Sequence, residues 1–89
     1  MDNIIKKLED LIRPEMEKMD IKLDSITWIN EKNNYTLRVI LDKVNGIDLD
    51  TIVDATNVIN PILDENDLIE EQYTLEVSSK ERGSEQNEW

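Results

Sequence analysis

The sequence predicts an α+β fold, a two-layer sandwich in which two helices cover one face of a small three-stranded sheet. Two segments have apolar residues at helical spacing, and three segments alternate apolar and polar residues as strands do. Their order along the chain is helix, strand, strand, helix, strand. The chain has 89 residues, which is enough for one small domain. We expect this domain to span residues 1–79 and residues 80–89, which lack periodicity, to form a disordered tail.

An amphipathic helix is predicted at the N-terminus, with Asp2 as a candidate N-cap. Pro14 lies inside the helical pattern, and we expect it to kink or divide the helix. The apolar stripe consists of Ile4, Ile5, Leu8, Leu11, Ile12, Met16 and Met19.

Residues 21–30 and 34–43 alternate with a period of two, and the polar stretch "NEKNN" between them predicts an antiparallel hairpin. In the second strand one face carries Tyr35, Leu37, Val39 and Leu41, and the other carries Thr36, Arg38, Ile40 and Asp42. Strict alternation places Trp28 on the face opposite Leu23, Thr27 and Ile29. Packing of Trp28 against a hairpin neighbour is favoured over a role as a binding anchor.

The stretch "VNGIDLD", residues 44–50, has two interpretations. Asn45-Gly46 is a hairpin turn signal, which would make the next residues a strand. A helix is favoured because Asp48 stands where an N-cap belongs, with Ile47 as one half of a hydrophobic staple. We expect Gly46 to adopt a positive φ before that cap. The residues with helical spacing are Leu49, Ile52, Val53, Thr56 and Ile59.

Asn60-Pro61 should end or break this second helix, because proline disfavours helical geometry in the preceding residue. Asn60 could then cap a short further turn. The last predicted strand is "YTLEVSS", in which Tyr73, Leu75 and Val77 point toward the helices.

Thr74, Glu76 and Ser78 are expected on the opposite, open face of the sheet. If the last strand is the neighbour of residues 34–43, Arg38 and Glu76 form a cross-strand pair on that face.

The composition excludes much of enzyme chemistry. The chain has no cysteine and no histidine, so thiol nucleophiles, zinc thiolates and the usual neutral-pH acid–base group are absent. A calcium loop centred on Gly46 fails, because Leu41 and Ile52 would occupy positions that require carboxylates. The chain also has no Gly-rich phosphate loop. We therefore expect no catalytic residue, no metal site and no cofactor.

The net charge of −11, from 21 acidic and 10 basic residues, favours a basic partner over phosphate backbones or anionic lipid. No apolar run approaches the ~20 residues that span a bilayer. We expect a soluble, cytoplasmic, monomeric protein without strong direct binding to nucleic acid or membranes.

The chain contains several motifs in a fixed order and spacing: Leu11 and Pro14, Asp42, Gly46-Ile47, Leu63-Asp64 and the final "YTLEVSS". Together they resemble the N-terminal domain of the ribosome maturation factor RimP family. Two departures exist. The family usually continues with Pro-Gly where this chain has Lys80-Glu81, and its C-terminal SH3-like barrel has no counterpart in these 89 residues.

The resemblance implies a non-enzymatic assembly factor for the small (30S) ribosomal subunit, which binds a basic small-subunit ribosomal protein and the pre-30S particle. On this hypothesis Glu76, together with Asp42 and the acidic stretch 64–71, belongs to the partner-binding surface. The candidate residues are Arg38, Asp42, Asp64, Glu76, Ser78 and Ser79. Two alternatives stay open: a KH-like RNA-contacting module, although no GXXG loop is present, and a structural half-domain without independent function.

Overall fold

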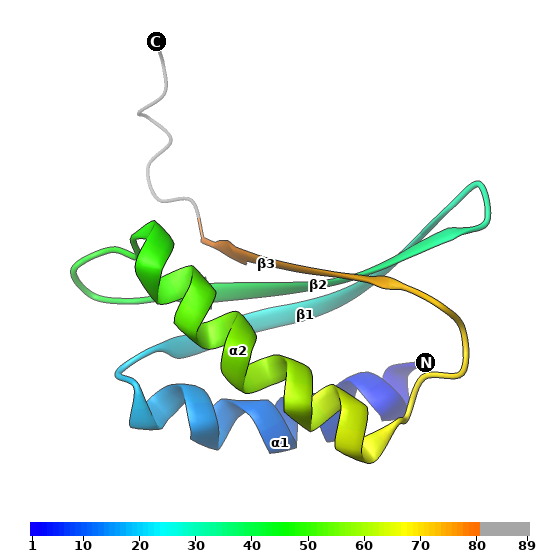
Figure 1. Cartoon of the computed structure of the whole chain (residues 1–89), viewed down its shortest axis with the longest axis horizontal. Helices are drawn as coiled ribbons and strands as arrows, with labels where there is room; N and C mark the ends of the chain where they lie inside the picture. The colour runs from blue at the N-terminus through cyan, green and yellow to red at the C-terminus, as the bar shows by residue number, and fades with distance from the viewer. Residues whose placement is uncertain (81–89) are drawn as a thin grey trace, which may run out of the picture.

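The computed structural model describes residues 1–80 of the chain. The element order is α1 (Asp2–Lys18), β1 (Lys22–Glu31), β2 (Asn34–Asp42), α2 (Leu49–Asn66) and β3 (Thr74–Ser79). Both helices lie on the same side of the sheet (Figure 1), so the predicted two-layer α+β sandwich is confirmed. The tail predicted for residues 80–89 lies, apart from Lys80, outside the described residues.

The sheet has the order β1-β2-β3. β1 and β2 form the predicted antiparallel hairpin, whereas β2 and β3 run parallel because α2 carries the chain back across the sheet. β2 is the central strand, and its residues Leu37, Val39 and Leu41 are completely buried. β1 and β3 are therefore the two edges of the described sheet.

An aliphatic core fills the space between the sheet and the helices. Residues one helical turn apart supply it, because side chains at i and i+4 share a helix face. α1 contributes Leu8, Ile12 and Met16, and α2 contributes Ala55, Ile59 and Leu63. Each large aliphatic side chain buried here stabilises the fold by about 1.5–3 kcal/mol. The loop before β3 adds Ile69, which is also buried.

Neither proline divides its helix. α1 continues through Pro14 to Lys18, and α2 continues through Pro61 to Asn66, so the break expected at Asn60-Pro61 was wrong. Ile59 and Leu63 stand on either side of Pro61 and are buried. Their burial offsets the ~3 kcal/mol that an internal proline costs a helix.

The start of α1 also differs from the expectation. Its N-cap residue is Met1, which makes no side-chain capping hydrogen bond, and Asp2 is already the first helical residue. The expected Asp2 cap was therefore wrong, although a carboxylate in the first turn still complements the helix dipole.

The turn that leads into α2 is built as predicted. Gly46 has φ +87° and donates its amide to the Lys43 carbonyl at 2.9 Å. Asp48 is the N-cap and its Oδ1 accepts hydrogen bonds from the Thr51 amide (2.9 Å) and hydroxyl (2.7 Å). Ile47 packs against the core. These contacts fix the angle at which α2 returns over the sheet.

The hairpin between β1 and β2 closes with two residues, Lys32 and Asn33, at φ 47° and 66°. Two consecutive positive φ values are typical of the tight turn whose twist matches that of paired strands.

A bulge in β1 changes which side chains face the helices. The register shifts between Leu23, opposite Leu41, and Ser25, opposite Ile40. The extra residue moves Ile26 and Trp28 onto the helix side, where Ile26 is buried and Trp28 packs against the core. Trp28 therefore shares a face with Leu23, so the expectation from strict alternation was wrong for Leu23, whereas Trp28 does lie opposite Thr27 and Ile29.

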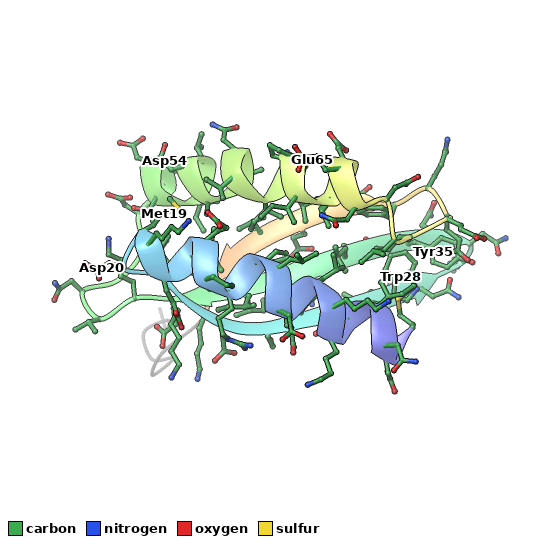
Figure 2. The ribbon with its side chains drawn as sticks, turned by 90° about the horizontal axis from the view of Figure 1, so that it is seen from below. Met19, Asp20, Trp28, Tyr35, Asp54 and Glu65 are labelled. Atoms are coloured by element: carbon green, nitrogen blue, oxygen red, sulfur yellow. The ribbon has the colours of Figure 1, made fainter. Side chains whose placement is uncertain are left out.

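Trp28 packs within an aromatic cluster at the hairpin end of the molecule. Its ring stacks on Tyr35 with the centroids 5.1 Å apart, and it meets Tyr73 edge-on at 5.8 Å. Figure 2 shows Trp28 and Tyr35 together at this end. The packing role expected for Trp28 is confirmed, and the cluster joins both hairpin strands to the entry of β3.

Candidate functional site

The side of the sheet away from the helices forms one surface, here called the open face (Figure 1). Strand alternation from the observed registers assigns its residues: Ser25, Thr27, Ile29, Thr36, Arg38, Ile40, Asp42, Thr74, Glu76 and Ser78. No described helix covers it. Most of these side chains are polar, which is typical of a sheet with one side toward solvent.

Arg38 and Glu76 pair at the centre of the open face. The two residues are directly opposite in the β2–β3 register, and Arg38 Nε and Nη2 donate to Glu76 Oε2 (3.0 Å) and Oε1 (3.3 Å). Both side chains are about 40% exposed, at 43% and 42%, so solvent screens the pair. Its contribution to folding is about 0.2–1 kcal/mol. The expected cross-strand pair is confirmed.

The chain leaves β3 at the end of the sheet where β2 also ends. Lys80 donates its amide to the Leu41 carbonyl at 2.7 Å, and its Nζ lies 3.2 Å from Asp24 Oδ1 on β1. Asp42 lies at the same end and its Oδ1 accepts from the Lys43 amide at 2.9 Å. The exit from the domain is therefore tied to both other strands.

A second feature lies between the C-terminal part of α2, the loop after it and β3, and is here called the acidic cleft. Its volume is about 560 Å³. Four carboxylates border it: Asp64, Asp67, Glu70 and Glu71. Its apolar lining comes from Leu63, Ile69, Tyr73 and Leu75, and Asn60 and Gln72 complete it. We call these apolar lining residues the floor of the cleft and its four carboxylates the rim.

Charge is distributed unevenly along the chain. Residues 1–43 carry eight basic and nine acidic residues, whereas residues 44–79 carry nine acidic residues and no basic one. The excess negative charge therefore belongs to α2, the loop and β3. None of the four rim carboxylates has an ion pair with a residue in the described range 1–80. Burial, followed by the charges of Asp64 and Asp67, raises the pKa of Tyr73 at the cleft floor.

The rim carboxylates stand at an unfavourable end of α2. A helix C-terminus carries partial negative charge and favours cations, yet the last turn of α2 has no basic residue. Asp67 is the C-cap, in the left-handed conformation at φ 43°, ψ 50°. In α1, by contrast, Lys18 occupies the last turn. The helix terminus favours cations, but the residues there are carboxylates. A local rule broken in this way is expected at functional or strained sites.

A family model for the RimP N-terminal domain matches residues 11–80. This match covers all three strands, all of α2 and the C-terminal part of α1 from residue 11 onward. The chain belongs to the RimP N-terminal domain family. The family name places the chain among ribosome maturation factors, as the sequence motifs predicted.

The candidate residues of this RimP N-terminal domain fall into two groups. Arg38, Asp42, Glu76 and Ser78 share the open face, whereas Ser79, at the end of β3, is opposite Leu41 in the register and belongs to the helix side. Asp64 lies in the helix layer and borders the acidic cleft. Whether Glu76 and the stretch 64–71 belong to one partner-binding surface therefore stays a prediction.

The apolar floor of the cleft is the part that sequence reasoning missed. Leu68 and Ile69 stand together between Asp67 and Glu70 in "NDLIEE", and the buried Ile69 brings this acidic loop against the core beside the cleft. A pair of apolar residues within an acidic run was the available signal.

Two further findings concern the described residues alone. Among residues 1–80 no three His, Cys, Asp or Glu side chains are placed so that they could hold a metal ion. Within the same range no helix is long and apolar enough to cross a membrane.

Proposed function

We propose that this RimP N-terminal domain assists maturation of the small ribosomal subunit by binding a basic small-subunit ribosomal protein, and that it does so without catalysis. Membership of the RimP N-terminal domain family supports the ribosomal context. The partner and the binding mode are inferred from the surface chemistry.

The observation that carries the proposal is the segregation of charge. Nine acidic and no basic residues in 44–79 give α2 and β3 a field of one sign. Such a field attracts a Lys/Arg-rich protein, raises its association rate and repels the phosphates of RNA. A ribosomal protein that has not yet bound its RNA exposes the cationic surface this domain would meet.

Binding to isolated small-subunit proteins tests the proposal. The full chain is immobilised and exposed to proteins extracted from purified small subunits, with the equally basic large-subunit proteins as the control. We expect it to retain one or a few small-subunit proteins at low salt and to release them as salt rises. Equal retention of small-subunit and large-subunit proteins would show that binding depends on positive charge alone and is not specific. Retention of neither would refute the proposal.

The alternative, an RNA-contacting module, makes the opposite prediction. It requires small-subunit RNA to shift in an electrophoretic mobility assay, with an affinity that falls steeply as salt rises. The anionic surface of α2 and β3 argues against this outcome. A mobility shift without retention of any ribosomal protein would favour the alternative.

A further inference from the structure

We propose that the acidic cleft and the outer edge of β3 together bind an extended, Lys/Arg-rich segment of the partner protein, which joins the sheet as a fourth strand. This inference rests on the proposed function and identifies the surface and the shape of the segment that it recognises.

The outer edge of β3 offers backbone groups for such pairing. Lys80 donates its amide to the Leu41 carbonyl of β2. Because successive residues of a strand turn their amides to opposite sides, Glu76 and Ser78 also face β2, whereas Leu75 and Val77 face outward. No described strand pairs with this edge. The backbone donors and acceptors of Leu75 and Val77 are therefore available to a partner strand.

The other edge of the sheet is less suited to pairing. β1 contains the bulge between Leu23 and Ser25, and bulges twist an edge and interrupt its ladder. β3 instead pairs with β2 in an unbroken register from Thr36 opposite Thr74 to Leu41 opposite Ser79. A regular edge accepts an added strand over its whole length.

The acidic cleft adjoins this regular edge. Leu75 belongs both to the outer edge of β3 and to the cleft floor, and Tyr73 precedes it. Side chains of an added strand would alternate between the helix side and the open face. Those on the helix side would meet the floor of the cleft and, at its rim, Asp64 and Asp67.

The negative charge around the cleft indicates which residues the partner segment should carry. The rim carboxylates lack ion-pair partners among residues 1–80, and Asp64 and Asp67 stand at the negative end of α2. Cations on the incoming segment would neutralise both the carboxylates and the helix terminus. A second copy of this chain would bring like charge to the same edge, which disfavours β3–β3 pairing.

The probe is a synthetic peptide of about eight alternating lysine and valine residues, a length that covers β3. It is titrated into the full chain, with a helix-prone lysine/alanine peptide of equal charge as the control. We expect tighter binding of the strand-forming peptide and slower amide hydrogen exchange at Leu75 and Val77. Equal affinity of the two peptides, or protection confined to β1, would overturn strand addition at β3.

A pair of matched variants locates the charge contribution. The cleft variant carries D64N, D67N, E70Q and E71Q, and the control variant carries D10N, E17Q, D54N and E65Q. Both lose four negative charges, and Asp54 and Glu65, labelled on α2 in Figure 2, are exposed and do not line the cleft. The cleft variant should bind the peptide about tenfold or more weakly, and the control less than about threefold. Similar losses in both would overturn the cleft as the binding site.

The same variants separate this inference from the proposed function. If the cleft variant, checked for folding by urea denaturation, retains small-subunit proteins as well as the parent does, the inference fails and the proposed function stands. If the parent retains none, both fail.

Discussion

Asp67→Asn should make the domain more stable although Asp67 borders the proposed binding cleft. Asp67 caps the C-terminus of α2 in the left-handed conformation, and its amide donates to the Leu63 carbonyl at 2.9 Å. Asparagine accepts that conformation as readily, so the change removes only a charge from the negative end of the helix. Removing an unfavourable charge there is worth about 0.3–1 kcal/mol, and we expect the lower half because Asp67 is exposed. The melting temperature should rise by roughly 1–4 °C.

The assay is urea denaturation of the parent and the variant at low salt and at about 1 M salt, where the Debye length is only about 3 Å. The gain should be present at low salt and nearly vanish at high salt. Asp54→Asn, in the interior of the same helix, removes the same charge away from the C-terminus and should gain less. A destabilised Asp67→Asn, or a gain that salt leaves unchanged, would refute the reasoning from the helix dipole.

Three further predictions concern the turn into α2 and the open face. Gly46→Val should cost roughly 1–2 kcal/mol from its positive φ alone, since nothing lies within 4 Å of an added Cβ, and Gly46→Asn should cost less in denaturant titrations. Hydrogen bonds from the Thr51 side chain and then its amide lower the pKa of Asp48 below 3.8. The stability lost in Asp48→Ala should therefore be seen above about pH 4 and disappear as acid protonates the parent; a pH-independent difference would contradict this. Glu76→Gln should cost at most about 1 kcal/mol and leave binding to small-subunit proteins unchanged if the Arg38 pair is purely structural. Weaker, less salt-sensitive binding would instead assign Glu76 to the interface.

The elements and the pairing of Arg38 with Glu76 were predictable because local signals decide them. Alternation in Tyr35–Leu41 fixes which face of β2 is buried, and the parallel crossover then sets β3 beside it. Gly46 and Asp48 have specific backbone and capping roles that the structure confirms. Each of these predictions depends on neighbouring residues or on one strand pairing.

The bulge in β1 and the continuity of α2 through Pro61 were not predictable in the same way. One inserted residue in a strand moves every later side chain to the opposite face of the sheet, which places Trp28 on the helix side. Only the pairing of β1 with β2 reveals the insertion. At Pro61, the burial of Ile59 and Leu63 outweighs the local preference of proline against a helix interior. The acidic cleft likewise depends on how the loop at Ile69 folds back against the core, which charge patterning cannot show.

Recovery of partners from cell lysate, before and after ribonuclease digestion, tests most directly whether this domain binds a ribosomal protein. The full chain is immobilised, and retained proteins are identified by mass spectrometry alongside the retained RNA. We predict that a basic small-subunit ribosomal protein is recovered and persists when the RNA has been digested. If every small-subunit protein is lost when the RNA is digested, the domain binds RNA and not a ribosomal protein directly. That result would contradict the proposed function.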